Sequence, residues 1–142
     1  MRKRHQRHDA IRNIIRAYPV KTQKDLAEQL RIAGYDCTQA TISRDVLELG
    51  LVKSREGVYV LPEEQRLARL VADLVVSVQA ACNLVVVKTR PGAAQGVSAA
   101  LDDASLKGAL GTVAGDDTIM IAAESFEAAE ELGAHLSGLR EA

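Results

Sequence analysis

The chain has 142 residues, and its formal net charge of −1 comes from 18 Lys and Arg against 19 Asp and Glu. This total hides two unlike halves: residues 1–65 hold 12 basic against 9 acidic side chains (net +3), and residues 66–142 hold 6 against 10 (net −4). The basic half favours a polyanionic partner. No segment approaches the ~20 apolar residues of a membrane helix, and the start lacks the apolar stretch of a signal peptide, so a cytoplasmic protein with no membrane partner is expected.

The chain begins with a basic arm that is expected to be solvated. Its histidines, His5 and His8, lie three residues apart, but two ligands on a frayed terminus fall short of what a metal site requires. The two cysteines, Cys37 and Cys82, form neither a CxxC pair nor a metal-ligand cluster, and both are expected to be reduced. The basic side chains of the arm that are expected to approach phosphates are Arg2, Lys3, Arg4 and Arg7.

Three short amphipathic helices are predicted after the arm. Pro19 ends the first, and Gly34 and Gly50 end the second and third. Thr22 and Thr38 are the expected N-caps of the second and third helices, and Asp25 stands three residues after Thr22 as in a capping box. The predicted apolar faces are Ile11, Ile14, Ile15 and Tyr18 in the first helix, Leu26, Ala27 and Leu30 in the second, and Ile42, Val46 and Leu49 in the third.

Two short helices joined by a Gly-containing turn are typical of a helix-turn-helix, and "LVKSREGVYVLP" then predicts two brief strands around an Arg-Glu-Gly turn. Together these elements predict a winged helix-turn-helix. The exposed pair Ser43–Arg44 would enter the major groove of DNA, while Lys53 and Arg55 on the wing would hold phosphates. The pattern also fits a domain that contacts protein, since exposed arginines on helices are commonly only solvated; the basic arm and wing favour DNA.

The second half predicts a small mixed domain. "LPEEQRL" (residues 61–67) reads as a linker, and two apolar strands are expected over 70–79 and 84–89. A helix opens at Pro91–Gly92, a hairpin covers 109–123, and a closing helix is capped by Ser125. The order β-β-α-β-β-α predicts an antiparallel or mixed sheet with helices on one face. The residues expected to point inward from the closing helix are Phe126, Ala129, Leu132, Leu136 and Leu139.

The expected fold class is therefore α+β, with an N-terminal winged helix-turn-helix domain (1–61), a linker (62–69) and a small α/β oligomerisation and ligand-binding domain (70–142). Domains of about 70 residues build only marginal cores, and oligomerisation is a common remedy.

The sequence carries no catalytic constellation, because it has no nucleophile beside a base and no Gly-rich phosphate loop. We therefore do not expect an enzyme. The adjacent acids Asp116 and Asp117 form its densest acidic site, with Asp102 and Asp103 as candidates to lie nearby. Gly-Asp-Asp-Thr is a common turn composition, so composition alone favours a bare turn over a binding site. A metal site is weaker still, since two adjacent carboxylates supply Mg²⁺ or Ca²⁺ with few fixed ligands.

Three stretches, "TQATISRD", "PGAAQ" and "GTVAGDDT", resemble in their order and spacing the bacterial arginine repressor family. The resemblance covers nearly the whole chain. It implies trimers that pair into a hexamer, with L-arginine bound between the trimers as co-repressor and no metal. It also implies a regulator that binds paired AT-rich palindromic operator boxes in double-stranded DNA and represses arginine biosynthesis genes. Some members of the family also activate catabolic genes.

The resemblance assigns the DNA-reading residues by matching position. Ser43 and Arg44 correspond to the base-reading pair of the family. The full set of residues expected to bind DNA is Gln39, Thr41, Ser43, Arg44, Lys53 and Arg55.

The resemblance likewise implies that Asp116 and Asp117 bind arginine, together with Gln95 and an acid at the end of the same helix. That acid is Asp102 or Asp103; Asp102, seven residues after Gln95, is preferred. A guanidinium and an α-ammonium would give two adjacent acids two cations to bind. The full set of residues expected to bind L-arginine is Gln95, Asp102, Thr112, Ala114, Asp116 and Asp117. The alternative to this function is a helix-turn-helix regulator that senses another amino acid or a metal.

Overall fold

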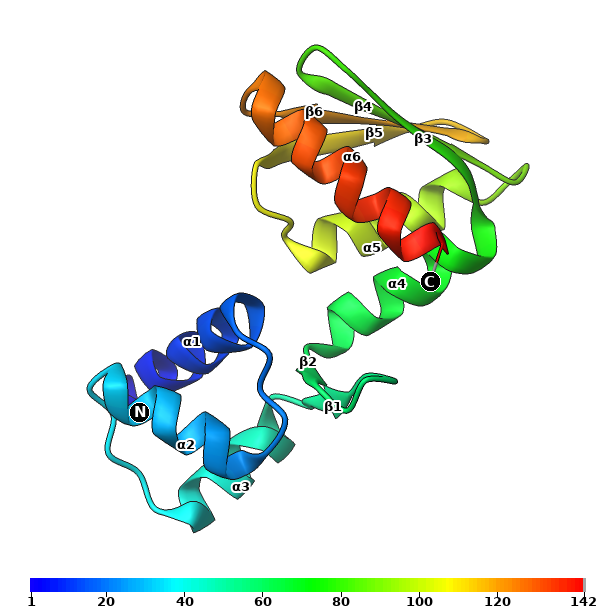
Figure 1. The fold of residues 1–142 in the computed structure, drawn as a ribbon. Helices are drawn as coiled ribbons and strands as arrows, with labels where there is room; N and C mark the ends of the chain where they lie inside the picture. Colours follow the sequence, from blue (N-terminus) through cyan, green and yellow to red (C-terminus); the bar gives the residue numbers. More distant parts are fainter. Residues whose placement is uncertain (142) are drawn as a thin grey trace. The chain divides into compact units, whose positions relative to one another are not determined.

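The computed structural model describes residues 1–141, which divide into two compact units, the first spanning Met1–Gln65 and the second beginning at Arg66. Unit 1 holds three complete helices, a two-stranded antiparallel wing and the first residues of a fourth helix (Figure 1). Among the described residues, no helix combines the length and apolar character that crossing a membrane demands. The elements of unit 1 are α1 (Arg2–Ala17), α2 (Gln23–Ile32), α3 (Gln39–Glu48), β1 (Val52–Lys53) and β2 (Tyr59–Val60).

The predicted helix ends of unit 1 are confirmed. The Thr22 hydroxyl accepts a hydrogen bond from the backbone N–H of Asp25 (3.0 Å), and the Thr38 hydroxyl accepts one from that of Thr41 (3.2 Å). Each bond satisfies an N–H that the first turn of a helix leaves without a partner. Gly34 and Gly50 follow α2 and α3 with φ of +95° and +66°, a conformation that glycine adopts without steric cost.

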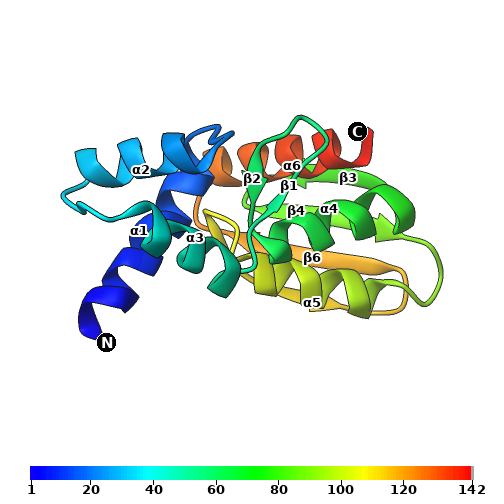
Figure 2. The same ribbon diagram turned by 90° about the horizontal axis from the view of Figure 1, so that it is seen from below.

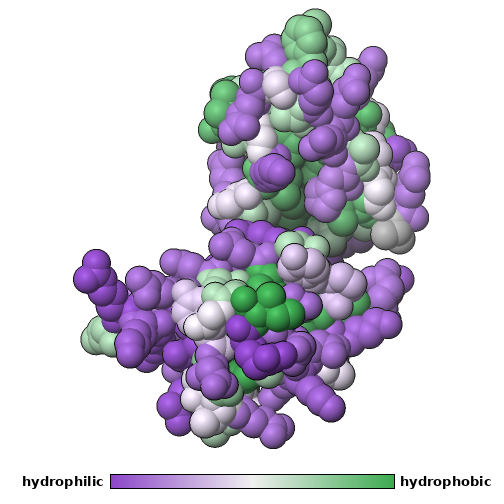
Figure 3. Space-filling view, turned by 60° about the vertical axis from the view of Figure 1, so that its left-hand side comes forward, coloured by the Kyte–Doolittle hydropathy of each residue, from purple (hydrophilic) through white to green (hydrophobic). Residues whose placement is uncertain are grey.

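The apolar faces of the three helices meet in one core, together with residues of the wing. The prediction fails at Tyr18, which is 53% exposed because α1 has already ended and the backbone there is extended. In Figure 3, the visible face of unit 1 is mainly hydrophilic around one compact hydrophobic patch. The buried apolar residues of this core are Ile11, Ile14, Ile15, Val20, Leu26, Leu30, Ile42, Val46, Leu51, Tyr59 and Leu61.

The arm is not frayed, and the expectation that it is solvated holds only for its first residues, since residues 2–6 are exposed but Arg7 and His8 are not. Helix α1 begins at Arg2, so the arm forms its first two turns. His8 is only 8% exposed, because it continues the stripe of Ile11 and Ile15 at helical spacing and packs towards α3. The basic side chain of Arg7 is also turned towards α3, where it pairs with an acid.

The stretch expected to be a linker is a helix. Helix α4 (Pro62–Leu74) covers residues 62–69 and also the first five residues of the strand predicted over 70–79. Pro62 suits the first helical position, and Glu63 and Glu64 suit the first turn. The apolar residues that favour a helix, at positions 67, 70, 71 and 74, are followed at once by the apolar residues of the next strand. The pattern therefore does not show where the helix ends and the strand begins.

Unit 2 is a four-stranded antiparallel sheet in the order β3-β4-β6-β5. Figures 1 and 2 show α5 and α6 on the same face of this sheet, which confirms the predicted β-β-α-β-β-α arrangement. Ser125 caps α6 as predicted, accepting a hydrogen bond from the Ala128 N–H (3.1 Å). The elements are β3 (Val75–Ala81), β4 (Leu84–Thr89), α5 (Ala94–Ala104), β5 (Ala109–Ala114), β6 (Thr118–Ala123) and α6 (Phe126–Glu141).

The two faces of the sheet differ. Alternate residues of the central strands, such as Val87 and Ile119, are buried under the helices. The opposite face has no helix over it in the described chain, and Met120 there is 48% exposed. Of the residues predicted to point inward from α6, Phe126 is wrong: as the first residue of the helix it is 63% exposed. The apolar side chains of the open face are Leu84, Val86, Val113, Met120 and Ala122.

Candidate nucleic-acid interface and ligand site

The residues predicted to read DNA lie on α3. Arg44 is exposed, on the side of the helix away from the buried Ile42 and Val46. Gln39, at the start of the helix, is exposed as well, and Thr41 is half-buried beside its cap.

Ser43 is held by a neighbour that the sequence analysis missed. Its hydroxyl donates a 2.7 Å hydrogen bond to the side-chain oxygen of Gln23, the first residue of α2. Because a hydroxyl has one proton, Ser43 can accept a hydrogen bond in this arrangement, and would have to leave Gln23 to donate one. The bond also links the start of α2 to α3.

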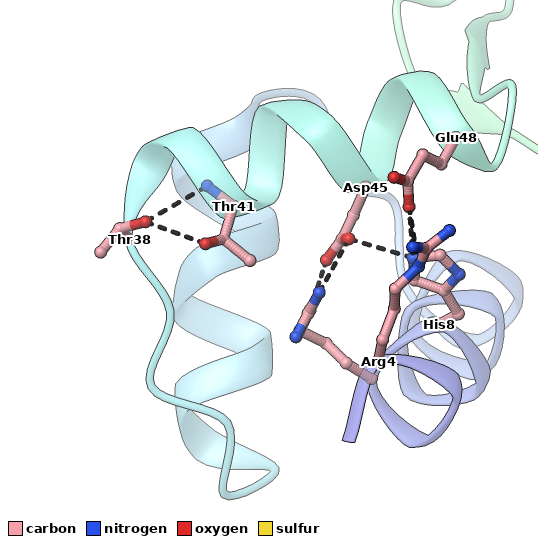
Figure 4. Close-up of polar contacts among 7 residues, drawn as sticks. Arg4, His8, Thr38, Thr41, Asp45 and Glu48 are labelled. Carbon is pink, nitrogen blue, oxygen red and sulfur yellow. Dashed lines mark hydrogen bonds and ion pairs between the residues drawn. The ribbon is translucent and has the colours of Figure 1, made fainter. Parts of the chain in front are cut away.

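The reverse side of α3 carries a network of charged groups (Figure 4). Asp45 is 1% exposed, and its two oxygens accept hydrogen bonds from Arg7, from Nε at 2.5 Å and from Nη2 at 3.0 Å. His8 Nε2 lies 3.0 Å from Asp45 Oδ1 and 3.3 Å from Glu48 Oε2. Arg4 Nε lies 3.2 Å from the same oxygen of Glu48. Basic side chains of α1 therefore bind the two carboxylates, of Asp45 and Glu48, on this side of α3.

These contacts shift the pKa values of the central pair. Burial alone would raise the pKa of the Asp45 carboxyl, but hydrogen bonds from Arg7 and His8 outweigh it, and that pKa is lowered. The hydrogen bond with Asp45 raises the pKa of the Arg7 guanidinium. Asp45 is therefore ionised at neutral pH.

His8, Asp45 and Glu48 also place three potential metal-ligand atoms within 4.8 Å of one another. Both oxygens of Asp45 are already bonded to Arg7, and Arg4 pairs with Glu48. Two guanidinium groups thus neutralise the two carboxylates, so the cluster fits an ion-pair network between helices better than a cation site.

The wing presents two basic side chains. Lys53, on β1, places its ammonium 5.2 Å from the centre of the Tyr59 ring, within the range of a cation–π contact. Arg55 is exposed at the turn, where Gly57 has a φ of +78°. Both side chains are exposed, so a polyanion that contacts the wing would meet their charges.

In unit 2, the acidic corner between β5 and β6 is held by its backbone. The carbonyl of Asp116 accepts from the N–H of Ala94 at the start of α5 (3.2 Å), and the carbonyl of Asp117 accepts from Thr89 (2.8 Å). Gln95 donates from its side chain to the carbonyl of Ala114 (2.8 Å). Both carboxylates are exposed, so the corner presents two negative charges at the start of α5.

The two candidate acids at the other end of α5 point to different partners. Asp103 pairs with Arg66 of α4. Asp102 accepts a 2.9 Å hydrogen bond from the hydroxyl of Thr112 on β5. Asp102 and Thr112 also line a cavity of about 360 Å³. Of the two acids, Asp102 is therefore the one that faces a cavity beside another candidate ligand residue.

Sequence reasoning missed Gln23 and Asp45, and it placed Arg7 and His8 on the arm without their contacts to α3. One signal could have found Asp45: it occupies an otherwise apolar helical face, three residues after Ile42, where a charge needs a buried partner. The identity of that partner could not be read from the sequence, because Arg7 stands 38 residues earlier.

Comparison with known proteins places both units. Residues 2–67 match the family "Arginine repressor, DNA binding domain", and residues 71–137 match "Arginine repressor, C-terminal domain". The chain belongs to the arginine repressor family. Its curated relatives in the family include the "Arginine repressor" of Desulforudis audaxviator, 48% identical over 151 aligned positions that cover 99% of both chains.

Two further arginine repressors are similar over most of the chain. That of Carboxydothermus hydrogenoformans is 46% identical, covering 85% of this chain and 88% of its own. That of Halothermothrix orenii is 42% identical, covering 89% and 91%. The similarity therefore spans nearly the full length of these relatives and includes both units. The family is one of transcriptional repressors, which is not a class of enzymes.

Proposed function

We propose that this chain is an arginine-responsive transcriptional repressor that binds operator DNA through unit 1 and L-arginine through unit 2. Its targets are arginine biosynthesis genes. It regulates transcription without an enzymatic activity of its own, and it acts in the cytoplasm, where bacterial operator DNA is found. The observation that carries the proposal is the match of both units, in order, to the two domains of one repressor family.

The DNA side rests on α3 and the wing. Arg44 is exposed, and its fork of donors suits the O6 and N7 acceptors of guanine in the major groove. Ser43 accepts a hydrogen bond from a neighbouring base, or leaves Gln23 to donate one to a phosphate, while Lys53 and Arg55 bind phosphates. Gln39 and Thr41, at the N-terminal end of α3, complete the surface, because recognition helices commonly contact bases from that end.

The ligand side rests on two groups of acids on unit 2. Asp116 and Asp117 present adjacent charges at one end of α5, and Asp102 presents a third at the other. L-Arginine carries a guanidinium and an α-ammonium, which pair with carboxylates through charge-assisted hydrogen bonds. Gln95, Thr112 and Ala114 lie between the two groups of acids and supply polar contacts. We assign no metal to this site.

The assembly rests on the open face of the sheet. A monomer would leave Leu84, Val86, Val113, Met120 and Ala122 against water, and apolar patches of this kind mark interfaces. We propose that unit 2 forms trimers and that two trimers form a hexamer. Because the candidate acids are exposed on one subunit, facing subunits would enclose the ligand. Arginine would then favour the hexamer by its differential affinity for the assembled state.

The domain boundaries complete the proposal. We place the DNA-binding domain at residues 1–61 and the ligand-binding and oligomerisation domain at 70–142. Residues 62–69, which connect them, belong to α4.

The deciding experiment measures binding to an AT-rich palindromic duplex with and without L-arginine, at two salt concentrations. We expect tighter binding with arginine at both. Citrulline, in which a neutral ureido group replaces the guanidinium, is the matched control and should have no effect. Equal binding with and without arginine would contradict the proposal. The alternative regulators are tested by calorimetry with lysine, citrulline and divalent cations.

A further inference from the structure

A chain of hydroxyl groups leads from the interior of unit 2 to Asp102. The Ser98 hydroxyl, on α5, lies 2.7 Å from the Thr112 hydroxyl on β5. The Thr112 hydroxyl in turn lies 2.9 Å from Oδ1 of Asp102. Ser98 is buried, whereas Asp102 is exposed. These two hydrogen bonds therefore link the buried Ser98 to a carboxylate at the surface.

The direction of both hydrogen bonds follows from counting protons. An ionised carboxylate has no proton to donate, so Thr112 must give its single hydroxyl proton to Asp102. The Thr112 oxygen can then only accept from Ser98, and Ser98 is the donor. Each hydroxyl has one arrangement that satisfies the whole chain. Without Ser98, the Thr112 hydroxyl would lose the partner that fixes its orientation.

A comparison with the neighbouring acid, Asp103, shows how these hydrogen bonds affect the charge of Asp102. Asp103 pairs with Arg66, so its charge is already matched within the subunit. Asp102 has no salt bridge within the described residues, and its contact with Thr112 is through a neutral hydroxyl. A neutral donor orients a carboxylate and leaves its charge available for a cation.

We infer that Ser98 is a positioning residue of the ligand site, which orients the Thr112 hydroxyl so that it holds the Asp102 carboxylate towards a cationic ligand. The inference rests on the proposed role of Asp102 in binding L-arginine. Ser98 itself is buried beneath Thr112 and acts through it. Because an exposed Asp side chain otherwise samples several rotamers, fixing it in advance lowers the entropy lost when ligand binds.

The test is calorimetric titration of L-arginine into the full-length protein and its variants. Ser98→Ala removes the donor, and we expect arginine affinity to fall by roughly 2- to 10-fold, the range of one net hydrogen bond. Thr112→Val removes the hydroxyl at nearly constant volume and should lower the affinity at least as much. Thr112→Ser keeps the hydroxyl and should bind nearly as wild type does. Ser137→Ala, the same change on α6, is the matched control.

The double variant Ser98→Ala/Thr112→Val separates positioning from general damage. If Ser98 acts only through Thr112, the double variant should bind arginine no more weakly than Thr112→Val alone. Additive losses would overturn the inference, as would wild-type affinity in Ser98→Ala or in Thr112→Val. If Ser98→Ala fails to fold, wild-type affinity in Thr112→Val still overturns the inference, because Ser98 is proposed to act only through the Thr112 hydroxyl. Absence of arginine binding by the wild-type protein would instead overturn the proposed function, and this inference with it.

Discussion

Arg7 and Asp45 form a bidentate ion pair that ties α1 to the buried side of α3, with Nε to Oδ2 at 2.5 Å and Nη2 to Oδ1 at 3.0 Å. Asp45 directly follows Arg44, the residue proposed to read bases. The helix that carries Arg44 is therefore fixed on its buried side by the residue next to Arg44. Arg7, which the sequence suggested for phosphate contacts, is instead paired with Asp45.

Asp45→Asn should destabilise unit 1. The substitution removes the charge that pairs with Arg7 while keeping nearly the same volume, and it leaves a partly buried guanidinium without its partner. Since the Arg7 side chain retains some contact with water (18% exposed), we expect a loss of about 1–3 kcal/mol in the free energy of unfolding. Urea denaturation measures it. Asp9→Asn, which breaks the exposed pair with Arg12, is the control and should change stability little.

The same ion pair should make stability depend on pH in the acid range. The pKa of Asp45 is lower in the folded protein than in the unfolded chain, where a value of about 3.9 is usual. The unfolded state therefore binds the proton first. The stabilising contribution is complete above about pH 5 and is lost as pH falls through the folded-state pKa, below about pH 4. Urea titrations across this range should give a flatter pH dependence for Asp45→Asn than for wild type.

Local signals predicted most of the fold. Thr22, Thr38 and Ser125 were recognisable as caps because the bonds they make reach only three residues along the chain. The hairpin around Asp116 and Asp117 was equally local. Each of these features needs only sequence spacing, and each is present in the structure.

Contacts between distant residues were not predictable in the same way. The pairing of Arg7 with Asp45 depends on how α1 packs against α3, and nothing in the local pattern of residues 2–8 distinguishes a docked helix from a solvated arm. The failure at α4 has another cause. Its apolar residues run directly into those of β3, so that helical and strand periodicities overlap near Leu74. At the candidate ligand site, the acids could be predicted from the sequence, but the hydrogen bonds that link Ser98 and Thr112 to Asp102 could not.

Arg44→Ala should weaken specific DNA binding without disturbing the fold. The side chain is exposed, so the core keeps its packing. We expect a loss of roughly 1–3 kcal/mol for each base pair that Arg44 contacts, and weaker discrimination at that position. Fluorescence anisotropy with operator and scrambled duplexes measures both. Arg31→Ala, an exposed arginine on α2, is the matched control. Undiminished operator binding by Arg44→Ala would remove Arg44 from the base-reading set.

Neutralising the wing should weaken binding to all DNA alike. Lys53 and Arg55 carry charge without a geometry suited to base edges, so they act through the release of counterions. In the variant Lys53→Gln/Arg55→Gln, we expect the slope of log K against log salt to become shallower by about 2, at ~0.9 for each lost phosphate contact. Binding isotherms at four salt concentrations test this. A loss confined to one operator base pair would contradict it.

Asp116→Asn and Asp117→Asn should lose most of their affinity for arginine while folding normally. The corner is fixed by main-chain bonds, from Ala94 and Thr89 to the carbonyls of the two acids, which an amide side chain leaves intact. The Asn side-chain oxygen at position 117 can still accept from the Thr118 hydroxyl, as Asp117 does at 2.9 Å. What disappears is the charge that would match a guanidinium or an ammonium.

These two variants should also separate ligand recognition from assembly. We expect both to form trimers, because the open face of the sheet is unchanged, and to bind operator DNA without responding to arginine. Removing acids relieves repulsion between facing trimers, so weak hexamers without ligand are expected. Titration calorimetry and sedimentation velocity measure the two properties on the same samples. Wild-type arginine affinity in both variants would show that Asp116 and Asp117 form only a turn, and the assignment of L-arginine to this corner would then be wrong.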